Sequence, residues 1–460
     1  MSLIKKALNF YRDREYFSSI LRIALPIAAQ NLVMASLNMV NILMIGQLGD
    51  AELAAVGLAG QIYFLVHLIL FGVASGASMF TAQLWGKGDI SNLRRVLGFS
   101  LKLGLLGSGI FWALAVFWPE YAMRFYSEDP VVIALGAEYL GIFGWSYPFF
   151  AITFAYAFVM RSTKNVRTPM LVTVFALTLG IFLSYGLIFG QFGLPELGMM
   201  GAAWGSLVAK VIESLLILVA VYWRRTNPAA ATWKDILEFD WAFTSKVMKP
   251  VLPVVTNELV WALGITTYYA IYARVGTDAV AAINIVTAIE QMIFVAFFGI
   301  GNATAILVGN LIGEGKKEQA YIFAGRSIGL QVFIGLILGL ALYASSDMVF
   351  GFYKVSDSVI ESARAIIIVA SSMAWLKGTN MLVIVGVMRA GGDTRFMLIL
   401  EVAAIWMVGV PIAALAAFVL QFPVHLVYLM IMIEEVFKLG VCLWRFFSRR
   451  WIKDLTQSLA

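Results

Sequence analysis

The chain has 460 residues, of which 61% are hydrophobic and 13% are charged, and its formal net charge at pH 7 is +6. Soluble domains carry about 25% charged residues, so this composition excludes a soluble globular protein and indicates one that crosses a membrane many times. A single cysteine and two distant histidines exclude an internal disulfide and a metal site built from these two residue types.

Twelve apolar segments are long enough to span a bilayer, which takes about 20 helical residues. They lie near residues 20–46, 53–80, 94–118, 131–160, 168–190, 200–223, 248–273, 280–308, 322–346, 359–388, 396–420 and 424–447. We therefore expect an all-α polytopic membrane protein with twelve transmembrane helices. The polar start of the chain has no apolar core followed by a small-residue cleavage site, so we expect no removable signal peptide.

Basic residues are concentrated in alternate loops and at both ends of the chain. The loops after the second, fourth, sixth, eighth and tenth spans hold Lys87, Arg94, Arg161, Lys164, Arg167, Arg224, Arg225, Lys234, Lys246, Lys316, Lys317, Arg389 and Arg395. The positive-inside rule then places both termini in the cytoplasm, as an even number of spans requires. We expect a multi-pass protein of the plasma (inner) membrane, whose positive charge faces lipid rather than nucleic acid.

The second half of the sequence repeats the first at a constant offset. Pro26 falls on Pro253 and Gly49 falls on Gly276 when the first and seventh spans are superposed without a gap, and we call this shift the repeat offset. Six spans per repeat is an even number, so the two halves have the same orientation and are related by an axis along the membrane normal. Parallel repeats of this kind form a substrate cavity between two lobes that rock against each other.

The repeat predicts five regions along the chain. They are a cytoplasmic N-terminal segment (1–19), an N-terminal six-helix lobe (20–224), a cytoplasmic linker (225–247), a C-terminal six-helix lobe (248–447) and a cytoplasmic tail (448–460). No Walker A, HExxH or GxSxG motif occurs, so we expect a transporter rather than an enzyme. Energy for transport must then come from an ion gradient acting on polar groups inside the membrane.

The seventh span contains one carboxylate deep in an apolar sequence. Glu258 lies about 14 Å beyond Lys249 along a helix, near the middle of a bilayer core about 30 Å thick. A charged side chain at that depth costs about 2.5–3.5 kcal/mol on insertion scales. Glu258 is either a neutral group hydrogen-bonded between helices or a group that titrates or binds a cation on a transport path. We favour the second interpretation.

A lysine and a second glutamate are the expected neighbours of Glu258. Buried Lys and Glu are each unfavourable alone, and pairing offsets much of this cost. We predict that Glu258, Glu290 and Lys377 form the cation-coupling site, in which Lys377 competes with the coupling ion for the carboxylates. The coupling ion is Na⁺ or H⁺, and the sequence does not choose between them. No other cofactor and no structural metal is expected.

Further polar residues lie on several predicted spans: Glu213, Glu401, Glu434, Glu435 and Lys438. Glu213 superposes on Glu434 in the repeat, and both approach the cytoplasmic end, which favours a structural role. Asp393 precedes the eleventh span and is expected to cap that helix.

The residues that we expect to line the substrate cavity are asparagines and aromatic side chains: Asn31, Asn38, Asn41, Asn257, Trp261, Tyr268, Asn302 and Asn380. The first three share one helical face because they are spaced by seven and three residues. Hydrogen bonding between helices is the alternative for the asparagines. The aromatic rings suit a flat organic cation, and ordinary packing or lipid contact is their alternative.

Several strings together resemble the multidrug and toxic compound extrusion (MATE) family. They are LPIAAQNLVMASLNMVNILMIGQLGDAELAAVGLA and GVASGASMFTAQLWGKGD in the first half, and LPVVTNELVWALG, GIGNATAILVGNLIGEGKKEQA and VMRAGGDT in the second. The resemblance covers essentially all twelve spans. It implies a cation-coupled antiporter that exports amphiphilic, often cationic, compounds by rocking of two six-helix lobes.

Some positions depart from the pattern that the resemblance implies. Many members carry an aspartate where this chain has Asn41, and some carry a Leu-Asp-Tyr string where it has Leu183-Ser184-Tyr185. These departures favour an ion site in the C-terminal lobe. Glu258 is similar to the seventh-span glutamate of other members, whereas their tenth-span acid corresponds to Gly378, next to Lys377.

The alternative within transport is a lipid-linked saccharide flippase of the same superfamily. Flippases need basic residues for a pyrophosphate, and the predicted spans offer Lys102 and Lys377 but no cluster of arginines. A membrane-embedded enzyme or channel would need a catalytic constellation or a ring of charges, and neither is visible. The expected partners are small amphiphilic substrates and membrane lipid, and the expected state is a monomer because one chain supplies both lobes.

Overall fold

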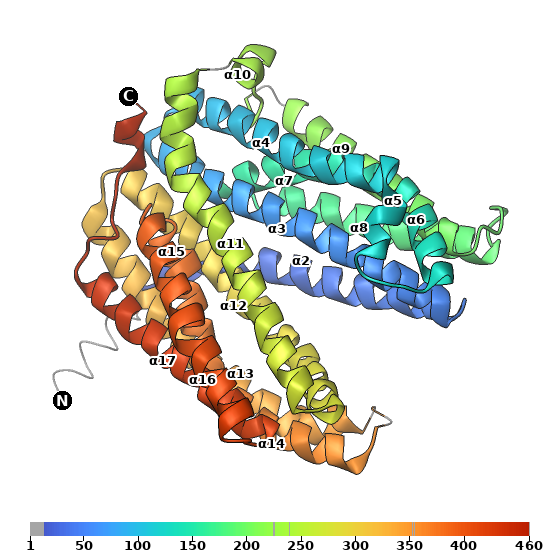
Figure 1. Ribbon diagram of the computed structural model, residues 1–460. Coiled ribbons are helices and arrows are strands. Elements are labelled where there is room, and N and C mark those ends of the chain that lie inside the picture. The colour runs from blue at the N-terminus through green and yellow to red at the C-terminus, as the bar shows by residue number, and fades with distance from the viewer. Residues whose placement is uncertain (1–12, 224–225, 239, 352, 354, 460) are drawn as a thin grey trace. The chain divides into compact units, whose positions relative to one another are not determined.

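A computed structural model of the protein describes residues 13–223, 226–238, 240–351, 353 and 355–459. Over these ranges every regular element is a helix (Figure 1). The expected N-terminal segment is described only from residue 13. Arg224 and Arg225, counted above as cytoplasmic, lie outside the described residues.

Twelve helical spans in these ranges match the twelve that the sequence predicts. They are α2 (Arg14–Gly46), α3 (Asp50–Lys87), α4 (Ile90–Phe117), the pair α6 (Pro130–Phe143) and α7 (Ser146–Ser162), α8 (Arg167–Phe189), α9 (Met199–Tyr222), α11 (Trp241–Val275), α12 (Thr277–Gly313), α13 (Lys317–Phe350), α14 (Asp357–Met381) continued by the π-helical η1 (Leu382–Met388), α15 (Thr394–Val402) continued by η2 (Ala403–Gly409), α16 (Val410–Ala414) and η3 (Leu415–Val419), and α17 (Val424–Phe447). Short helices α5 (Pro119–Arg124), α10 (Trp233–Leu237) and η4 (Leu455–Ser458) lie between or after them. The fourth span is bent by 50° between α6 and α7, a break that the sequence did not predict.

The internal repeat extends to backbone conformation. Helix α2 begins at Arg14 and helix α11 begins at Trp241, two positions that the repeat offset superposes. Gly88 and Gly315, which the same offset superposes, follow α3 and α12 with φ angles of +79° and +78°. Glycine adopts this left-handed conformation without the steric cost that a Cβ would bring, so both turns depend on it.

The described chain forms two compact packing units. One contains residues 29–255, and the other contains residues 13–28 and 256–458. The divisions fall inside α2 and α11, at positions that the repeat offset makes equivalent. The lobes predicted to rock during transport, 20–224 and 248–447, remain a prediction, because packing alone does not test movement.

Each unit has its own apolar core, built where small residues let helices approach closely. In the first unit, Gly201 and Gly205 of α9 face the backbone of α8, where a Cβ would collide. In the second unit, Gly335 and Gly339 of α13 face α14 in the same way. Close backbone approach of this kind is how membrane helices gain packing energy, since lipid supplies no hydrophobic drive between them. The second unit also holds most of the buried charge.

Candidate functional site

Glu258 is held by an arginine that the sequence analysis assigned to a loop. Arg389, directly after η1, donates from Nη2 to Glu258 Oε1 at 2.7 Å, and the two side chains are 4% and 12% exposed. The expected neighbours of Glu258, Lys377 and Glu290, pair with each other instead. The correction has a physical reason: a guanidinium on a long side chain reaches back into the protein from a helix end, which loop charge alone does not reveal.

The Lys377–Glu290 pair joins three helices. Lys377 of α14 donates to Glu290 Oε1 of α12 at 2.8 Å. Tyr428 of α17 donates to the same oxygen at 3.1 Å and lies beside the lysine Nζ, which is 4.9 Å from the centre of the tyrosine ring. The pairing of two predicted site residues is therefore seen, but their contact with Glu258 is not.

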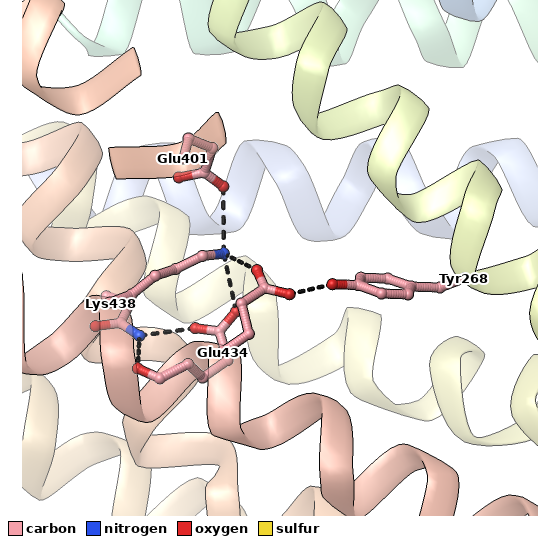
Figure 2. A network of polar contacts seen from close by, with 6 residues as sticks. Tyr268, Glu401, Glu434 and Lys438 are labelled. Carbon is pink, nitrogen blue, oxygen red and sulfur yellow. Dashed lines mark hydrogen bonds and ion pairs between the residues drawn. The ribbon is translucent and has the colours of Figure 1, made fainter. Parts of the chain in front are cut away.

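A second lysine, Lys438 of α17, lies among three carboxylates (Figure 2). Its Nζ contacts Glu434 Oε1 at 2.5 Å, Glu435 Oε1 at 3.2 Å and Glu401 Oε1 at 3.3 Å. Glu401 comes from α15 and the two others come from the helix of the lysine itself. We call Glu401, Glu434, Glu435 and Lys438 the α17 cluster.

Neutral donors support two of the three carboxylates. The Tyr268 hydroxyl of α11 donates to Glu434 Oε2 (Figure 2). Asn380 of α14 donates from Nδ2 to Glu435 Oε2 at 2.7 Å. Among the described residues, Glu401 has only its contact with Lys438. The carboxylates of the cluster are thus stabilised to different degrees.

Local backbone features make room for these contacts. Gly409, at the end of η2, lies against the Tyr268–Glu434 contact, where any Cβ would collide with both side chains. Asn380 and Glu401 each lie two residues before a π-helical segment, η1 and η2 respectively. Widened turns of this type are frequent at functional sites because they redirect side chains into the interior.

Acidic groups outnumber basic groups in the three ion-paired groups just described, those of Arg389, Lys377 and Lys438. Five carboxylates, Glu258, Glu290, Glu401, Glu434 and Glu435, face three cations, Lys377, Arg389 and Lys438. An uncompensated buried charge costs several kcal/mol. The excess therefore favours a bound proton or cation. In the described part of the chain, no three acidic, histidine or cysteine side chains are arranged to hold a metal ion.

The asparagines predicted on the first span belong to the unit of residues 29–255 and are described within it. Asn38 is exposed, and Asn31 and Asn41 are half-buried. Asn41 Oδ1 is buried without a hydrogen-bond donor among the described residues. The three share a helical face, as expected, and no cation contacts them in the described structure of this unit.

The predicted cavity residues of the other unit fall into different environments. Trp261 is 39% exposed, whereas Tyr268 is buried in the α17 cluster. Asn302 donates to the Phe298 carbonyl of its own helix at 2.8 Å. Asn257 is buried, with no donor to its Oδ1 among the described residues, and Asn380 contacts Glu435. Tyr268 and Asn380, which were predicted to line the substrate cavity, thus contact the carboxylates Glu434 and Glu435.

The first unit contains a simpler buried pair. Lys210 of α9 donates to Glu213 Oε2 at 2.9 Å, one helical turn apart, and its Nζ lies 4.8 Å from the centre of the Phe150 ring. A structural role was expected for Glu213, and its contact with Lys210 is compatible with that role. Arg161, at the end of α7, donates to Gln30 Oε1 at 3.0 Å.

The turn after η1 is packed against the end of the chain. Asp393 was expected to cap α15, but its side chain makes no cap hydrogen bond and instead contacts Arg445 at 2.6 Å and Lys453 at 2.5 Å. Two cations attract the carboxylate more strongly than a backbone amide does. Trp451, fully buried, packs on Gly391, where a Cβ would collide with it. This tail therefore supports the turn that follows Arg389.

Sequence reasoning missed Arg389 and the convergence of the α17 cluster. A signal for Arg389 existed in the repeat, because VMRS (159–162) superposes on VMRA (387–390) when the repeat offset is lengthened by a single position. An arginine at both places indicates a shared structural role. The residues of the α17 cluster were noted as intramembrane polar groups, but no sequence pattern shows that α11, α14 and α15 meet α17 there.

Comparisons with known proteins agree with this fold. The probable multidrug resistance protein NorM of Thermotoga maritima is 24% identical over 98% of this chain and 97% of its own length. The probable multidrug resistance protein YoeA of Bacillus subtilis is 24% identical over 84% of each chain. A crystal structure of a MATE transporter in the bent conformation superposes with a TM-score of 0.85 at 19% identity, covering 97% of both chains.

A family model settles the relationship. The MatE model matches twice, over residues 26–186 and 253–415, which together make up more than half of the chain. The starting points of the two matches are the two positions that the repeat offset superposes, Pro26 and Pro253. The resemblance inferred from the sequence is therefore confirmed, and this chain belongs to the MatE family.

Proposed function

We propose that this protein is a cation-coupled antiporter that exports amphiphilic, often cationic, organic compounds by alternating access. Membership of the MatE family and full-length relatives named as multidrug resistance proteins support efflux. The observation that carries ion coupling is the excess of carboxylates over cations in the ion-paired groups of Arg389, Lys377 and Lys438. The protein is a multi-pass membrane protein, and we propose the plasma membrane, cytoplasmic termini and a monomeric state for it.

Coupling follows from competition for the same carboxylates. Arg389 and Lys377 neutralise Glu258 and Glu290 when no external cation is bound. A proton or Na⁺ that binds Glu258 weakens its contact with Arg389, and this contact links α11 to the turn after η1. Ion binding can then bias a conformational equilibrium, because the ion interacts differently with the paired and unpaired arrangements.

The substrate class follows from the aromatic residues near these groups. Trp261 is partly exposed on α11, one helical turn from Glu258 on the same face. An aromatic face attracts an organic cation by about 0.5–2 kcal/mol, and a neighbouring carboxylate adds to that attraction. A saccharide flippase fits less well, because Lys377, Arg389 and Lys438 are each engaged by a carboxylate and do not form a pyrophosphate site.

Dye efflux from proteoliposomes tests this proposal. A proton gradient and a sodium gradient are imposed in separate experiments on vesicles that contain the purified protein. One of the two gradients, but not the other, should drive export of a cationic dye. Glu258→Gln should reduce gradient-driven efflux to the level of empty vesicles. Glu120→Gln, at an exposed surface pair with Arg124, is the matched control and should export normally. Absence of efflux under both gradients would contradict the proposal.

A further inference from the structure

The α17 cluster carries more negative charge than its surroundings compensate. Three carboxylates share Lys438, whose side chain is 6% exposed. If all three were ionised, the cluster would hold two uncompensated negative charges in the membrane interior. Each uncompensated ion would cost several kcal/mol there, so at least one carboxyl group is neutral.

The contacts identify which carboxyl group is neutral. Glu434 has the shortest contact with Lys438 and accepts a hydrogen bond from Tyr268. Glu435 accepts a hydrogen bond from Asn380 and lies within electrostatic reach of Lys377. Each therefore has a second polar partner besides Lys438.

Glu401 has no such second group. Among the described residues its side chain, 5% exposed, contacts only Lys438, at the longest of the three distances, 3.3 Å. The other groups that face it are Glu434, Glu435 and the Cys442 thiol of α17, none of which carries positive charge. Tyr268 of α11 contacts Glu434, and Asn380 of α14 contacts Glu435, so neither of these contacts involves Glu401. Glu401 is thus the least stabilised anion of the cluster.

A second observation is a buried acceptor without a donor at the edge of the α17 cluster. Asn380 is 2% exposed, its amide group donates to Glu435, and its Oδ1 has no donor among the described residues. A buried acceptor without a donor costs about 1–3 kcal/mol. This unfilled acceptor adjoins Glu435 and shows that the cluster lacks a donor, whereas the choice of Glu401 rests on its contacts with Lys438 alone.

We propose that Glu401 is a proton-binding site that exchanges one proton during transport, while Lys438 stays in contact with Glu434 and Glu435. This inference rests on the proposed antiport function and assigns H⁺ as an ion that the same unit handles. Loss of the proton makes Glu401 a competitor for Lys438. Lys438 then moves away from Glu434, and the contact between Glu434 and Tyr268 changes. The proton on α15 is in this way linked to α11, the helix that carries Glu258.

Infrared difference spectroscopy of the purified protein tests the site directly. A protonated buried carboxyl group gives a carbonyl band that ionised carboxylates lack, and the wild-type protein should show this band at neutral pH and lose it at alkaline pH. Glu401→Gln should remove the band and should fold, because an amide resembles the neutral acid in shape. Glu401→Asp should retain a shifted band. Glu213→Gln removes a buried carboxylate that is balanced by Lys210, so it should leave the band unchanged.

Transport measurements separate this inference from the proposed function. In proteoliposomes, Glu401→Gln should lose proton-driven dye efflux while binding the dye with unchanged affinity. If the wild type exports dye under a sodium gradient and is insensitive to pH, or if the carbonyl band persists in Glu401→Gln, the inference is wrong although antiport stands. If neither gradient drives efflux, the antiport proposal fails and the infrared band still decides whether Glu401 binds a proton.

Discussion

The two units contain equivalent arginines with different partners. Arg161 of the first unit superposes on Arg389 of the second in the repeated VMR string. Arg161 donates to the neutral amide of Gln30 at 3.0 Å, and Arg389 donates to the carboxylate of Glu258 at 2.7 Å. Gln30 directly precedes Asn31, which the repeat offset places on Glu258. The backbone and the arginine are thus repeated, but the ionisable acceptor occurs in one unit only.

The same contrast separates α9 from α17. Counting back from Trp223 and Trp444 superposes Glu213 on Glu434, and each contacts a lysine. In α9 one lysine balances one carboxylate. In α17 one lysine faces three carboxylates, one of which comes from α15. The fold is nearly symmetric while its buried charge is not, which suggests that ion binding is concentrated in residues 256–458.

The largest expected effect is from loss of the shared lysine. Lys438→Met leaves three buried carboxyl groups without a cation and should lower the free energy of unfolding by about 3–5 kcal/mol, because an uncompensated buried charge is strongly destabilising. Thermal unfolding in detergent measures the change, and Lys438→Arg is the control that keeps the charge. An unchanged unfolding temperature would mean that all three carboxyls are already neutral.

Double variants sharpen the comparison between the units. Lys210→Met should destabilise the first unit by about 3 kcal/mol, and adding Glu213→Gln should recover most of the loss because the carboxylate that lost its lysine is then removed. Adding Glu434→Gln to Lys438→Met should recover much less, since Glu401 and Glu435 are still present. Equal recovery in both units would contradict the difference in charge balance.

A smaller effect on stability is expected when the second unit is made to resemble the first. Glu258→Gln should still accept a hydrogen bond from Arg389, as Gln30 does from Arg161, and should cost about 1–2 kcal/mol in unfolding free energy. Gradient-driven efflux should nevertheless be lost. Glu258→Ala leaves Arg389 without this acceptor and should unfold at a lower temperature than Glu258→Gln. Normal efflux by Glu258→Gln would remove Glu258 from the coupling site.

The smallest effect is expected at a pair outside the buried clusters. Arg326 contacts Asp13 at 2.5 Å, and the carboxylate is 39% exposed. The hydrogen bond from Arg326 lowers the pKa of Asp13 below its ordinary value. The pair therefore contributes stability above the unfolded-state pKa and loses it as the pH falls through the folded-state pKa. Asp13→Asn should change the unfolding free energy by about 1 kcal/mol or less at neutral pH, because solvent screens the 39% exposed carboxylate. A loss of several kcal/mol would contradict this.

The sequence predicted the spans and the repeat because hydropathy and glycine positions are local signals. Twelve spans and the repeat offset are confirmed, and Glu258 was found because a lone acid in an apolar segment is conspicuous. The bend between α6 and α7 was missed, since neither Gly144 nor Trp145 interrupts the apolar pattern.

The partners of the buried acids needed three-dimensional information. Arg389 was counted as a cytoplasmic loop charge, although its guanidinium is buried against Glu258. Helical periodicity shows which residues of α17 share a face, but it does not show that α15 brings Glu401 to that face. The coupling ion and the roles of these residues in transport stay predictions.

The packing of Trp451 on Gly391 has a practical consequence for protein engineering. A deletion that starts at Arg449 removes the indole that covers Gly391 and the lysine that contacts Asp393, so the turn next to Arg389 loses two of its supports. Expression vectors for this protein should therefore keep the tail through Ser458 and attach any affinity tag after a spacer. Shortening this end would disturb Arg389, whose contact with Glu258 is to be measured.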